Sequence, residues 1–319
     1  MDSARAVTRA VADFAAEYLP GAEHVCVGLS GGPDSLALTA AAVRAGLRVT
    51  ALVVDHGLQD GSAEVAEGAA HAAAELGATA QILPVSVGRH GGLEAAARTA
   101  RYDALREAGD GDPVLFGHTM DDQAETVLLG LSRGSGGRSI AGMRPWSPPW
   151  GRPLLGVRRA QTRAMCAELG LMPHHDPHNS DPRFTRVRLR SEVLPLLDDV
   201  LNGGVAEALS RTASALQADN DALDAAAEKV AALAASDSEL VVAVLADAPL
   251  AVRTRVIRSW LSAVGATEPT VRVIGAVDRL VMTWRGQGGV AIGGDTEGRL
   301  EVVRADGLLT VRRSARSRL

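Results

Sequence analysis

Short apolar runs alternate with alanine-rich segments of helical composition over the first two thirds of the chain. The run at 48–54 is nearly continuous in apolar residues, which is typical of a strand buried on both faces of a parallel sheet. Shorter runs at 26–29, 79–87, 113–117 and 152–155 predict further strands. The segments of helical composition lie at 2–18, 35–45, 62–76, 92–102, 121–131 and 158–169. The alternation predicts an α/β fold, with a Rossmann-like parallel sheet and helices on both faces.

The pattern changes in the last third of the chain. An alanine-rich helical stretch over 204–235 is followed by predicted helices near 249–263 and 269–282. Short strands are predicted near 288–292, 299–304 and 308–311. Since 319 residues suffice for two domains, we expect a first domain over 1–200 and a smaller, α-rich second domain over 201–319.

Composition limits the core and the compartment. Hydrophobic residues make up 46% of the chain and aromatic residues only 3%, so alanine, valine and leucine must form most of the core. Cys26 and Cys166 form no CxxC pair and no zinc spacing, which is consistent with a reducing cytosol. We find no secretory signal and no apolar run of the roughly 18 residues that a membrane span needs. The expected location is therefore cytoplasmic.

Basic residues are concentrated in two regions, although the net charge is −5. Residues 131–190 hold eleven arginines against three acids, and residues 251–319 hold twelve against six. Such regions suit the binding of a polyanion, but they are also what a solvated, arginine-rich surface would show. The second region contains Arg253, Arg255, Arg258, Arg272, Arg279 and Arg285.

A glycine turn stands between the first strand and the helix that follows it. The segment Ser30-Gly31-Gly32-Pro33-Asp34-Ser35 interrupts an apolar run and leads directly into a helix-forming run. Glycines let the backbone approach a ligand closely, and the free N–H groups of a helix N-terminus favour anions, so this is a candidate phosphate site. It is no Walker A loop, because the only lysine of the chain is Lys229, and it lacks the Gly-x-Gly-x-x-Gly fingerprint.

Acidic side chains follow two of the predicted strands. Asp55 and His56 come after the second strand, and Asp121, Asp122 and Glu125 begin the helix after the fourth. The carboxyl ends of parallel strands are where ligands bind in such sheets. Three crowded acids could bind a divalent cation or the ammonium groups of an amino acid, whereas the simpler alternative is helix capping.

Arginines in two other segments could contact a substrate or could have only a structural role. Arg98 and Arg101 share a helix face with Glu94, where an ordinary ion pair is the alternative to a site. Arg133 and Arg138 lie in a glycine-rich segment that is either a phosphate-contacting loop or a flexible linker. His174, His175, Asp176 and His178 are residues of types that bind metals. A zinc site is not expected there, because no predicted helix would fix these ligands and no cysteine accompanies them.

The glycine turn resembles the PP-loop, Ser-Gly-Gly-x-Asp-Ser, of the ATP pyrophosphatases. Five further segments, in the order of the chain, resemble the PP-loop tRNA(Ile)-lysidine synthases, so that the resemblance covers 25–197. Two departures are Val187, where an asparagine is usual, and Arg138-Ser139-Ile140, where Gly-Leu types are commoner. The segments are Val-Asp-His-Gly-Leu, Glu-x-x-x-Arg-x-x-Arg-Tyr, Gly-His-x-x-Asp-Asp-Gln-x-Glu-Thr, Arg-Gly-x-Gly…Gly-Met and Asp-x-x-Asn-x-Asp…Arg-x-x-x-Arg. The length is similar to that of the short members of the family, without a further C-terminal domain.

The resemblance implies a ligase that uses ATP, Mg²⁺ and L-lysine. Cytidine 34, in the CAU anticodon of tRNA(Ile), would be adenylated at its C2 oxygen with release of pyrophosphate. The ε-amine of lysine would then attack C2 and expel AMP, giving lysidine. The alternatives are a tRNA sulfur-transferase, which needs a cysteine pair, a small-molecule ligase of the NAD-synthetase or GMP-synthetase kind, and a non-catalytic nucleotide-binding module. Whether the chain forms a homodimer is left open.

The resemblance also implies roles for particular residues. ATP would be held by Ser30, Gly31, Gly32, Pro33, Asp34, Ser35, Asp55 and His56. Asp34 would also help to hold Mg²⁺, and Asp122 and Glu125 would hold lysine. Arg186 and Arg190 would stabilise the adenylated intermediate, so the expected catalytic residues are Asp34, Asp122, Arg186 and Arg190. The other expected substrate contacts are Arg98, Arg101, Arg133 and Arg138, and the basic second domain would contact tRNA phosphates.

Overall fold

The computed structural model describes seven stretches of the chain. They are residues 2–57, 61–86, 93–134, 136–176, 181–267, 269–295 and 298–314. The chain divides into two compact units, Met1–Ser214 and Ala215–Leu319, which we describe separately. Within these stretches, no helix is both long and apolar enough to cross a membrane.

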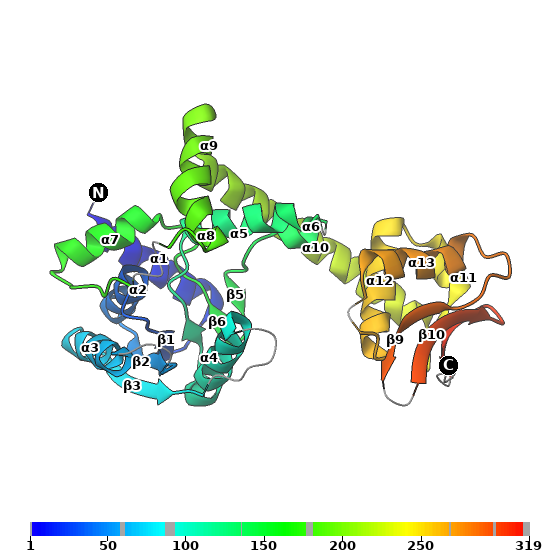
Figure 1. Ribbon diagram of the computed structural model, residues 1–319, viewed down its shortest axis with the longest axis horizontal. Coiled ribbons are helices and arrows are strands. Elements are labelled where there is room, and N and C mark those ends of the chain that lie inside the picture. The colour runs from blue at the N-terminus through cyan, green and yellow to red at the C-terminus, as the bar shows by residue number, and fades with distance from the viewer. Residues whose placement is uncertain are drawn as a thin grey trace. The chain divides into compact units, whose positions relative to one another are not determined.

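The first unit is built on a six-stranded sheet with the order β3-β2-β1-β4-β6-β5 (Figure 1). All neighbouring strands pair in parallel except β5, which is antiparallel to β6. The predicted parallel sheet is therefore confirmed. The strands are β1 (His24–Gly28), β2 (Arg48–Asp55), β3 (Thr79–Pro84), β4 (Val114–Leu115), β5 (Trp146–Ser147) and β6 (Trp150–Gly151).

Helices cover both faces of this sheet, as the sequence predicts. Along β1, Val25 and Val27 belong to one hydrophobic cluster, and Cys26 between them belongs to another, because successive side chains point to opposite faces. The first cluster contains residues of α1, α2, α3 and α7, and the second contains Leu105 of α4. The helices are α1 (Ser3–Tyr18), α2 (Pro33–Arg44), α3 (Ser62–Glu75), α4 (Leu93–Gly109), α5 (Met120–Ser132) and α7 (Arg159–Glu168).

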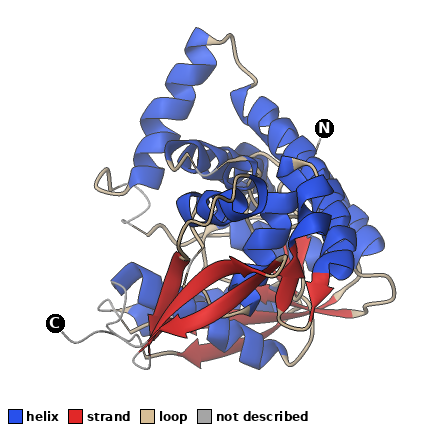
Figure 2. Cartoon of the chain, turned by 90° about the vertical axis from the view of Figure 1, so that its right-hand side faces the viewer, coloured by secondary structure: helices blue, strands red, loops and turns tan. Residues whose placement is uncertain are grey.

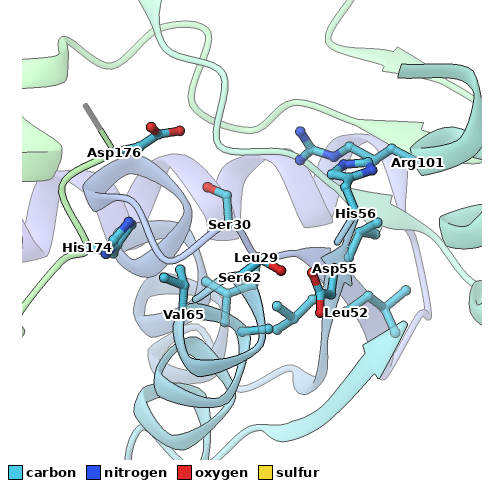
Figure 3. Close-up of a pocket in the computed structure, with 13 residues that line it drawn as sticks. Leu29, Ser30, Leu52, Asp55, His56, Ser62, Val65, Arg101, His174 and Asp176 are labelled. Atoms are coloured by element: carbon cyan, nitrogen blue, oxygen red, sulfur yellow. The ribbon is translucent and has the colours of Figure 1, made fainter. Parts of the chain in front are cut away.

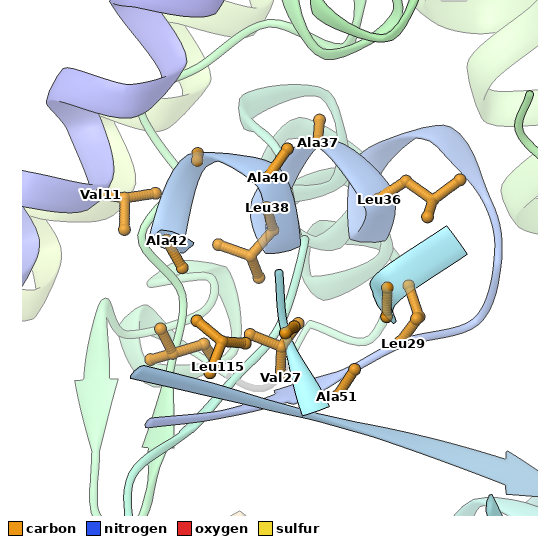
Figure 4. Packing of buried hydrophobic residues seen from close by; sticks show 14 of the residues in the cluster. Val11, Val27, Leu29, Leu36, Ala37, Leu38, Ala40, Ala42, Ala51 and Leu115 are labelled. Carbon is orange, nitrogen blue, oxygen red and sulfur yellow. The ribbon is translucent and has the colours of Figure 1, made fainter. Parts of the chain in front are cut away.

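Helix α2 lies against the sheet with nearly its whole length buried. Its residues from Ser35 to Ala42 are all buried, and Figure 4 shows Leu38 and Ala42 facing Val27 and Leu115 of the strands. Alanine has a small side chain and a high helix propensity, so it allows close packing without breaking the helix. The N-terminus of α2, which begins at the glycine turn, is thereby held in a fixed position.

Three local predictions differ from the structure. The strand predicted at 152–155 is wrong: this segment is a turn whose Leu154 and Leu155 are buried, and β6 ends at Gly151. The glycine-rich segment contains a short helix, α6 (Gly137–Ile140), where none is predicted. A helical segment begins at Thr185, and the pattern of apolar residues in the sequence does not predict this segment. This segment comprises α8 (Thr185–Arg188), the π-helical turn η2 (Leu189–Val193) and α9 (Leu194–Val200).

The second unit combines helices with a five-stranded antiparallel sheet of order β7-β8-β11-β10-β9 (Figure 2). The helices and the last three strands lie where they are predicted, while α11 and the short strands β7 and β8 are not predicted. The helices are α10 (Val205–Ala234), whose residues up to Ser214 belong to the first unit, α11 (Val242–Asp247), α12 (Leu250–Ala263) and α13 (Val271–Met282). The strands are β7 (Ala235–Ser236), β8 (Glu239–Val241), β9 (Val290–Asp295), β10 (Gly298–Ala305) and β11 (Leu308–Ser314).

Two arginines of the second basic region belong to the framework of this unit. Arg253 is buried, with its Nε 2.6 Å from Asp278 Oδ1 and its Nη1 donating to the Ala248 carbonyl. Arg255 pairs with Asp224 at 2.9 Å and donates to Asn220 Oδ1. The expectation that both belong to an exposed, tRNA-contacting surface is therefore wrong, because their guanidinium groups are used inside the unit.

Candidate active site

The glycine turn is closed by its own hydrogen bonds. Ser35 Oγ accepts from the Ser30 amide at 3.2 Å and donates to the Gly32 carbonyl at 3.0 Å. Gly31 has a φ of +76°, which L side chains rarely adopt, and Pro33 begins α2. The first N–H groups of α2 have no acceptor within the helix, so they are available to an anion. The predicted phosphate-binding geometry is present.

The loop opens onto a cavity of about 680 Å³. One part of its wall is formed by the loop residues from Ser30 to Ser35, apart from Gly31. The other parts are the residues that follow β4, the helix α7, and the segment 171–175. The same cavity is lined by Asp122, Arg159 and Arg190. A phosphate site and a group of charged side chains therefore share one space.

A smaller cavity of about 310 Å³ adjoins it at the carboxyl end of β2. Both cavities are lined by Ser30, Arg101 and His174. Figure 3 shows Asp55, His56 and Arg101 on one side, with His174 across from them. The Asp55 carboxylate accepts from the Gly57 amide at 2.9 Å, and this bond contributes most to lowering the pKa of Asp55. The floor is apolar, with Leu52 and Val53 from β2.

Three of the predicted acids converge on one arginine that the sequence does not single out. The guanidinium of Arg159 lies 3.3 Å from Asp34 Oδ2, 2.5 Å from Asp122 Oδ1 and 3.4 Å from Glu125 Oε1. Only 10% of the Arg159 side chain is exposed, and none of the Glu125 side chain is. Thr162, one turn further along α7, donates a hydrogen bond to Asp34 Oδ1. These residues form what we call the acid–arginine cluster, together with Arg190.

The predicted Arg190 completes this cluster, and Arg186 lies at its edge. Arg190 Nε is 2.8 Å from Glu125 Oε1, and its Nη2 is 3.6 Å from Asp122 Oδ1. Arg186 Nη1 is 3.8 Å from Glu125 Oε2, and half of its side chain is exposed. Thus all four predicted catalytic residues meet at one place, although they come from α2, α5, α8 and η2.

Burial and charge act differently on the two aspartates. Burial raises the pKa of Asp34 and outweighs the hydrogen bond from Thr162 and the charge of Arg159. Burial also raises the pKa of Asp122, but Arg159 and the two hydrogen bonds from Thr119 outweigh it, so this pKa falls below its ordinary value. The ionised form of Asp34 is therefore disfavoured by its burial, and an added cation would stabilise it.

Asp121, the third acid of the predicted group, faces away from this cluster. Its carboxylate accepts from Arg158 Nε and Nη2, and from the Arg159 amide at 2.8 Å. Arg158 also reaches Glu207, on α10, at 2.6 Å. Asp121 thus anchors the start of α7, and it places Arg159 among the other acids.

The remaining predicted residues lie in two further places. Arg98 and Arg101, on α4, cover the rings of Tyr102 and Phe116, with Cζ 4.9 and 5.9 Å from the ring centroids. They line a pocket of about 220 Å³ with His56 and His118. Arg133 and Arg138 are exposed at the end of α5 and in α6. The side chain of Glu94, and the residues His178 and Asn179, lie outside the described part of the chain.

The donor set around Asp34 fits a hard divalent cation. Carboxylate oxygens of Asp34 and Asp122 are both near Arg159, and Mg²⁺ prefers such ligands together with phosphate oxygens. A second group, His24, Cys26 and Asp112, lies at the amino ends of the strands. It does not fit a metal, because both ring nitrogens of His24 are hydrogen-bonded and burial raises the pKa of the Cys26 thiol to about 11.

Comparisons with known proteins agree with this arrangement. Residues 3–197 match the model of the PP-loop domain, and residues 240–310 match the model of the TilS substrate binding domain. The tRNA(Ile)-lysidine synthase of Nocardia farcinica is 62% identical over 97% of this chain and 98% of its own length. That of Mycobacterium tuberculosis is 61% identical over 98% of both chains. The structure of the U34-tRNA thiolase NcsA from Methanococcus maripaludis covers 66% of this chain and 78% of its own, with a TM-score of 0.56 and 18% identity, which shows a shared fold.

Proposed function

Since the chain belongs to the tRNA(Ile)-lysidine synthase family, we propose that its two adjoining cavities together carry out both halves of lysidine formation. The protein is a ligase that binds ATP and forms lysidine in tRNA. The observation that carries the assignment of residues is that the PP-loop and the acid–arginine cluster line the same cavity of about 680 Å³. An activated intermediate formed at the loop would therefore meet the second substrate without leaving the protein.

In the first half, the loop from Ser30 to Ser35 holds the phosphates of ATP on backbone N–H groups and hydroxyls. The smaller cavity receives the adenosine part of ATP, with Asp55 and His56 beside it. The C2 oxygen of cytidine 34 attacks the α-phosphorus, and pyrophosphate leaves. Mg²⁺, held by Asp34 when bound, would neutralise charge on the departing pyrophosphate.

In the second half, the ε-ammonium of lysine gives up a proton to solvent, and the resulting amine attacks C2 of the adenylated cytidine. The new C–N bond forms as the C2–oxygen bond breaks, and AMP leaves with that oxygen. Asp122 and Glu125 are suited to hold the ammonium groups of lysine. Glu125 is fully buried beneath Arg190, so of these two acids Asp122 is the one that lines the cavity.

The arginines of the cluster have a matching task. Arg190 lines the cavity and is held by Glu125, so it is positioned to stabilise negative charge on the adenylated intermediate. Arg186 is half exposed and could reach the same intermediate or the nucleotide. The exposed Arg133 and Arg138, together with Arg98 and Arg101, would contact tRNA phosphates, a contribution that weakens as salt rises.

The two cysteines support ligation rather than sulfur transfer. Cys26 and Cys166 are both buried, and burial raises the pKa of each thiol to about 11. Such thiols are protonated at neutral pH and are poor nucleophiles. The use of tRNA as substrate supports a cytoplasmic location. Whether the chain forms a homodimer is a separate question, which light scattering would answer.

The test is incorporation of labelled lysine into tRNA. With ATP and Mg²⁺, the purified protein should label a transcript with a CAU anticodon, and mapping should place the label on the first anticodon position. A transcript with uridine at that position should not be labelled. No incorporation, together with AMP release driven by a small acceptor, would contradict the proposal.

A pair of variants two residues apart tests the assignment of the cluster. Arg190→Gln should remove lysine incorporation, because Arg190 lines the cavity. Arg188→Gln should retain it, because Arg188 pairs with Glu192 at 2.8 Å on the surface of the same helical segment. Equal activity of the two variants would remove Arg190 from the mechanism.

A further inference from the structure

A large aromatic side chain is exposed where α13 ends. Trp284 lies two residues beyond Met282, the last residue of α13, and 45% of its surface is accessible. Trp150 and Trp260, by contrast, are each 9% exposed. Met282 itself is 48% exposed, so two large apolar side chains face solvent within three residues. An exposed apolar group with charged neighbours often marks an interaction site.

An arginine of the neighbouring strand supports the indole ring. The guanidinium carbon of Arg304, on β10, lies 5.1 Å from the centroid of the Trp284 ring. Arg304 Nη1 donates to the carbonyls of Leu280 and Val281, both at 3.0 Å. Unpaired carbonyls at a helix C-terminus attract a cation, so these bonds hold Arg304 in place. The ring is thereby fixed against a positive charge.

Three further arginines lie on α13 or directly beside Trp284 in the sequence. Arg272 and Arg279 are exposed and lie seven residues apart, which places them on one face of α13 at a spacing of roughly 10 Å. Arg285 is exposed directly after Trp284. Within the described part of the chain, none of these three arginines forms an ion pair. Unlike Arg253, they keep their charge available to a partner.

We propose that Trp284, Arg279 and Arg285 form a docking surface for tRNA, on which an unpaired base stacks on the indole. Stacking on an aromatic ring, with arginines on the flanking phosphates, is the usual chemistry of single-stranded RNA recognition. A second copy of this chain fits less well, because it would bring two arginine-rich surfaces together. The inference rests on the proposed function only in taking tRNA as the RNA.

Binding of a tRNA(Ile) transcript to the full chain, measured at several salt concentrations, tests this surface. Trp284→Leu should weaken binding about tenfold without changing the salt slope, because stacking carries no counterion release. Trp284→Phe should retain most of the affinity. Arg279→Gln should reduce the salt slope by about one. Leu233→Ser is the matched control, since Leu233 is an exposed apolar residue of the same unit and no arginine of the surface contacts it in the described structure.

Two further readouts separate recognition from folding and from catalysis. Tryptophan fluorescence should be quenched by tRNA in the wild type and not in Trp284→Phe. The KM for tRNA should rise in Trp284→Leu, while the KM for ATP and the rate at saturating tRNA stay unchanged. Equal loss of affinity in the leucine and phenylalanine variants, with earlier thermal unfolding of both, would overturn the proposal in favour of a structural role.

Other outcomes also decide the question. Unchanged tRNA affinity in Trp284→Leu overturns the proposal, and so does self-association that this variant alone abolishes while tRNA binding is kept. Failure of the proposed function looks different. In that case the wild type incorporates no lysine into any tRNA, whatever residue stands at position 284.

Discussion

The guanidinium of Arg159 lies 2.5 Å from the carboxylate of Asp122, although 37 residues separate them in the sequence. Each residue stands in the first turn of its helix, α7 and α5 respectively. The same guanidinium also contacts Asp34 and Glu125, so one cation balances one buried and two partly buried acids with help from Arg190. A cationic substrate or a metal ion must therefore compete with Arg159 for these carboxylates.

Arg159→Gln should unfold more easily and lose lysine incorporation. Three carboxylates, of which Glu125 is fully buried, would lose a shared partner, and removing one member of a buried ion pair costs about 3–5 kcal/mol. Urea denaturation gives the free energy of unfolding. Arg9→Gln is the control, because Arg9 is 81% exposed and its pair with Asp13 contributes about 0.5 kcal/mol at most. Identical unfolding midpoints for the two variants would show that Arg159 does not hold the cluster together.

Asp34→Asn should abolish pyrophosphate release without weakening the fold. Burial raises the pKa of Asp34, so the ionised carboxylate reduces stability above that pKa and the protonated one does not. At pH 7 the neutral asparagine should therefore unfold at the same or a higher urea concentration than the wild type. This advantage should shrink as pH falls through the pKa of Asp34. Activity within threefold of the wild type would count against the role of Asp34 in holding the metal.

His118 should make stability depend on pH between about 4 and 6.5. Burial lowers the pKa of His118 to about 4, whereas an unfolded histidine titrates near 6.5. The unfolded chain therefore binds more protons in this window, and the free energy of unfolding should fall as pH drops through it. His118→Gln should flatten this dependence, leaving the smaller contribution of His56, whose pKa burial also lowers. An unchanged pH profile in the variant would mean that His118 is freely protonated in the fold.

Gly117→Ala should weaken ATP binding by at least about tenfold. A Cβ at Gly117 would lie 2.7 Å from the Asp34 carbonyl and 3.0 Å from the Ser35 amide, so the loop and the start of α2 would have to shift. The KM for ATP measures this shift. Gly68→Ala is the control, because a Cβ there meets nothing within 4 Å and alanine stabilises a helix interior by about 0.5–1 kcal/mol. A normal KM for ATP in Gly117→Ala would show that the loop tolerates displacement.

The parts of the site that the sequence reveals are local in the chain. The turn from Ser30 to Ser35 and the acids after β4 are short segments whose residue types carry their own meaning. The role of Arg159 cannot be read from the sequence, because its partners lie 34 to 125 residues away. An Arg-Arg pair at the start of a helix is also too common to indicate a site. Only the folded sheet brings α2, α5 and α7 to one end.

The predictions that are wrong have a related cause, because the type of a residue does not reveal whether its side chain is exposed. Arg253 and Arg255 count as positive charge in the sequence, yet acids from other helices of their unit bind both of them. Leu154 and Leu155 resemble a strand because they are apolar, but they are buried as the inner side of a turn. The exposed Trp284 shows the converse, since its type alone would predict burial.

The hydrogen bonds of Ser35 close the glycine turn from within the loop itself. A loop that is ordered in advance loses no conformational entropy when it receives a phosphate chain. That advantage extends to every ligand that carries the same chain, including pyrophosphate, which the reaction releases there. Product inhibition, competitive with ATP, is thus a consequence of the same rigidity that makes the loop an effective cradle.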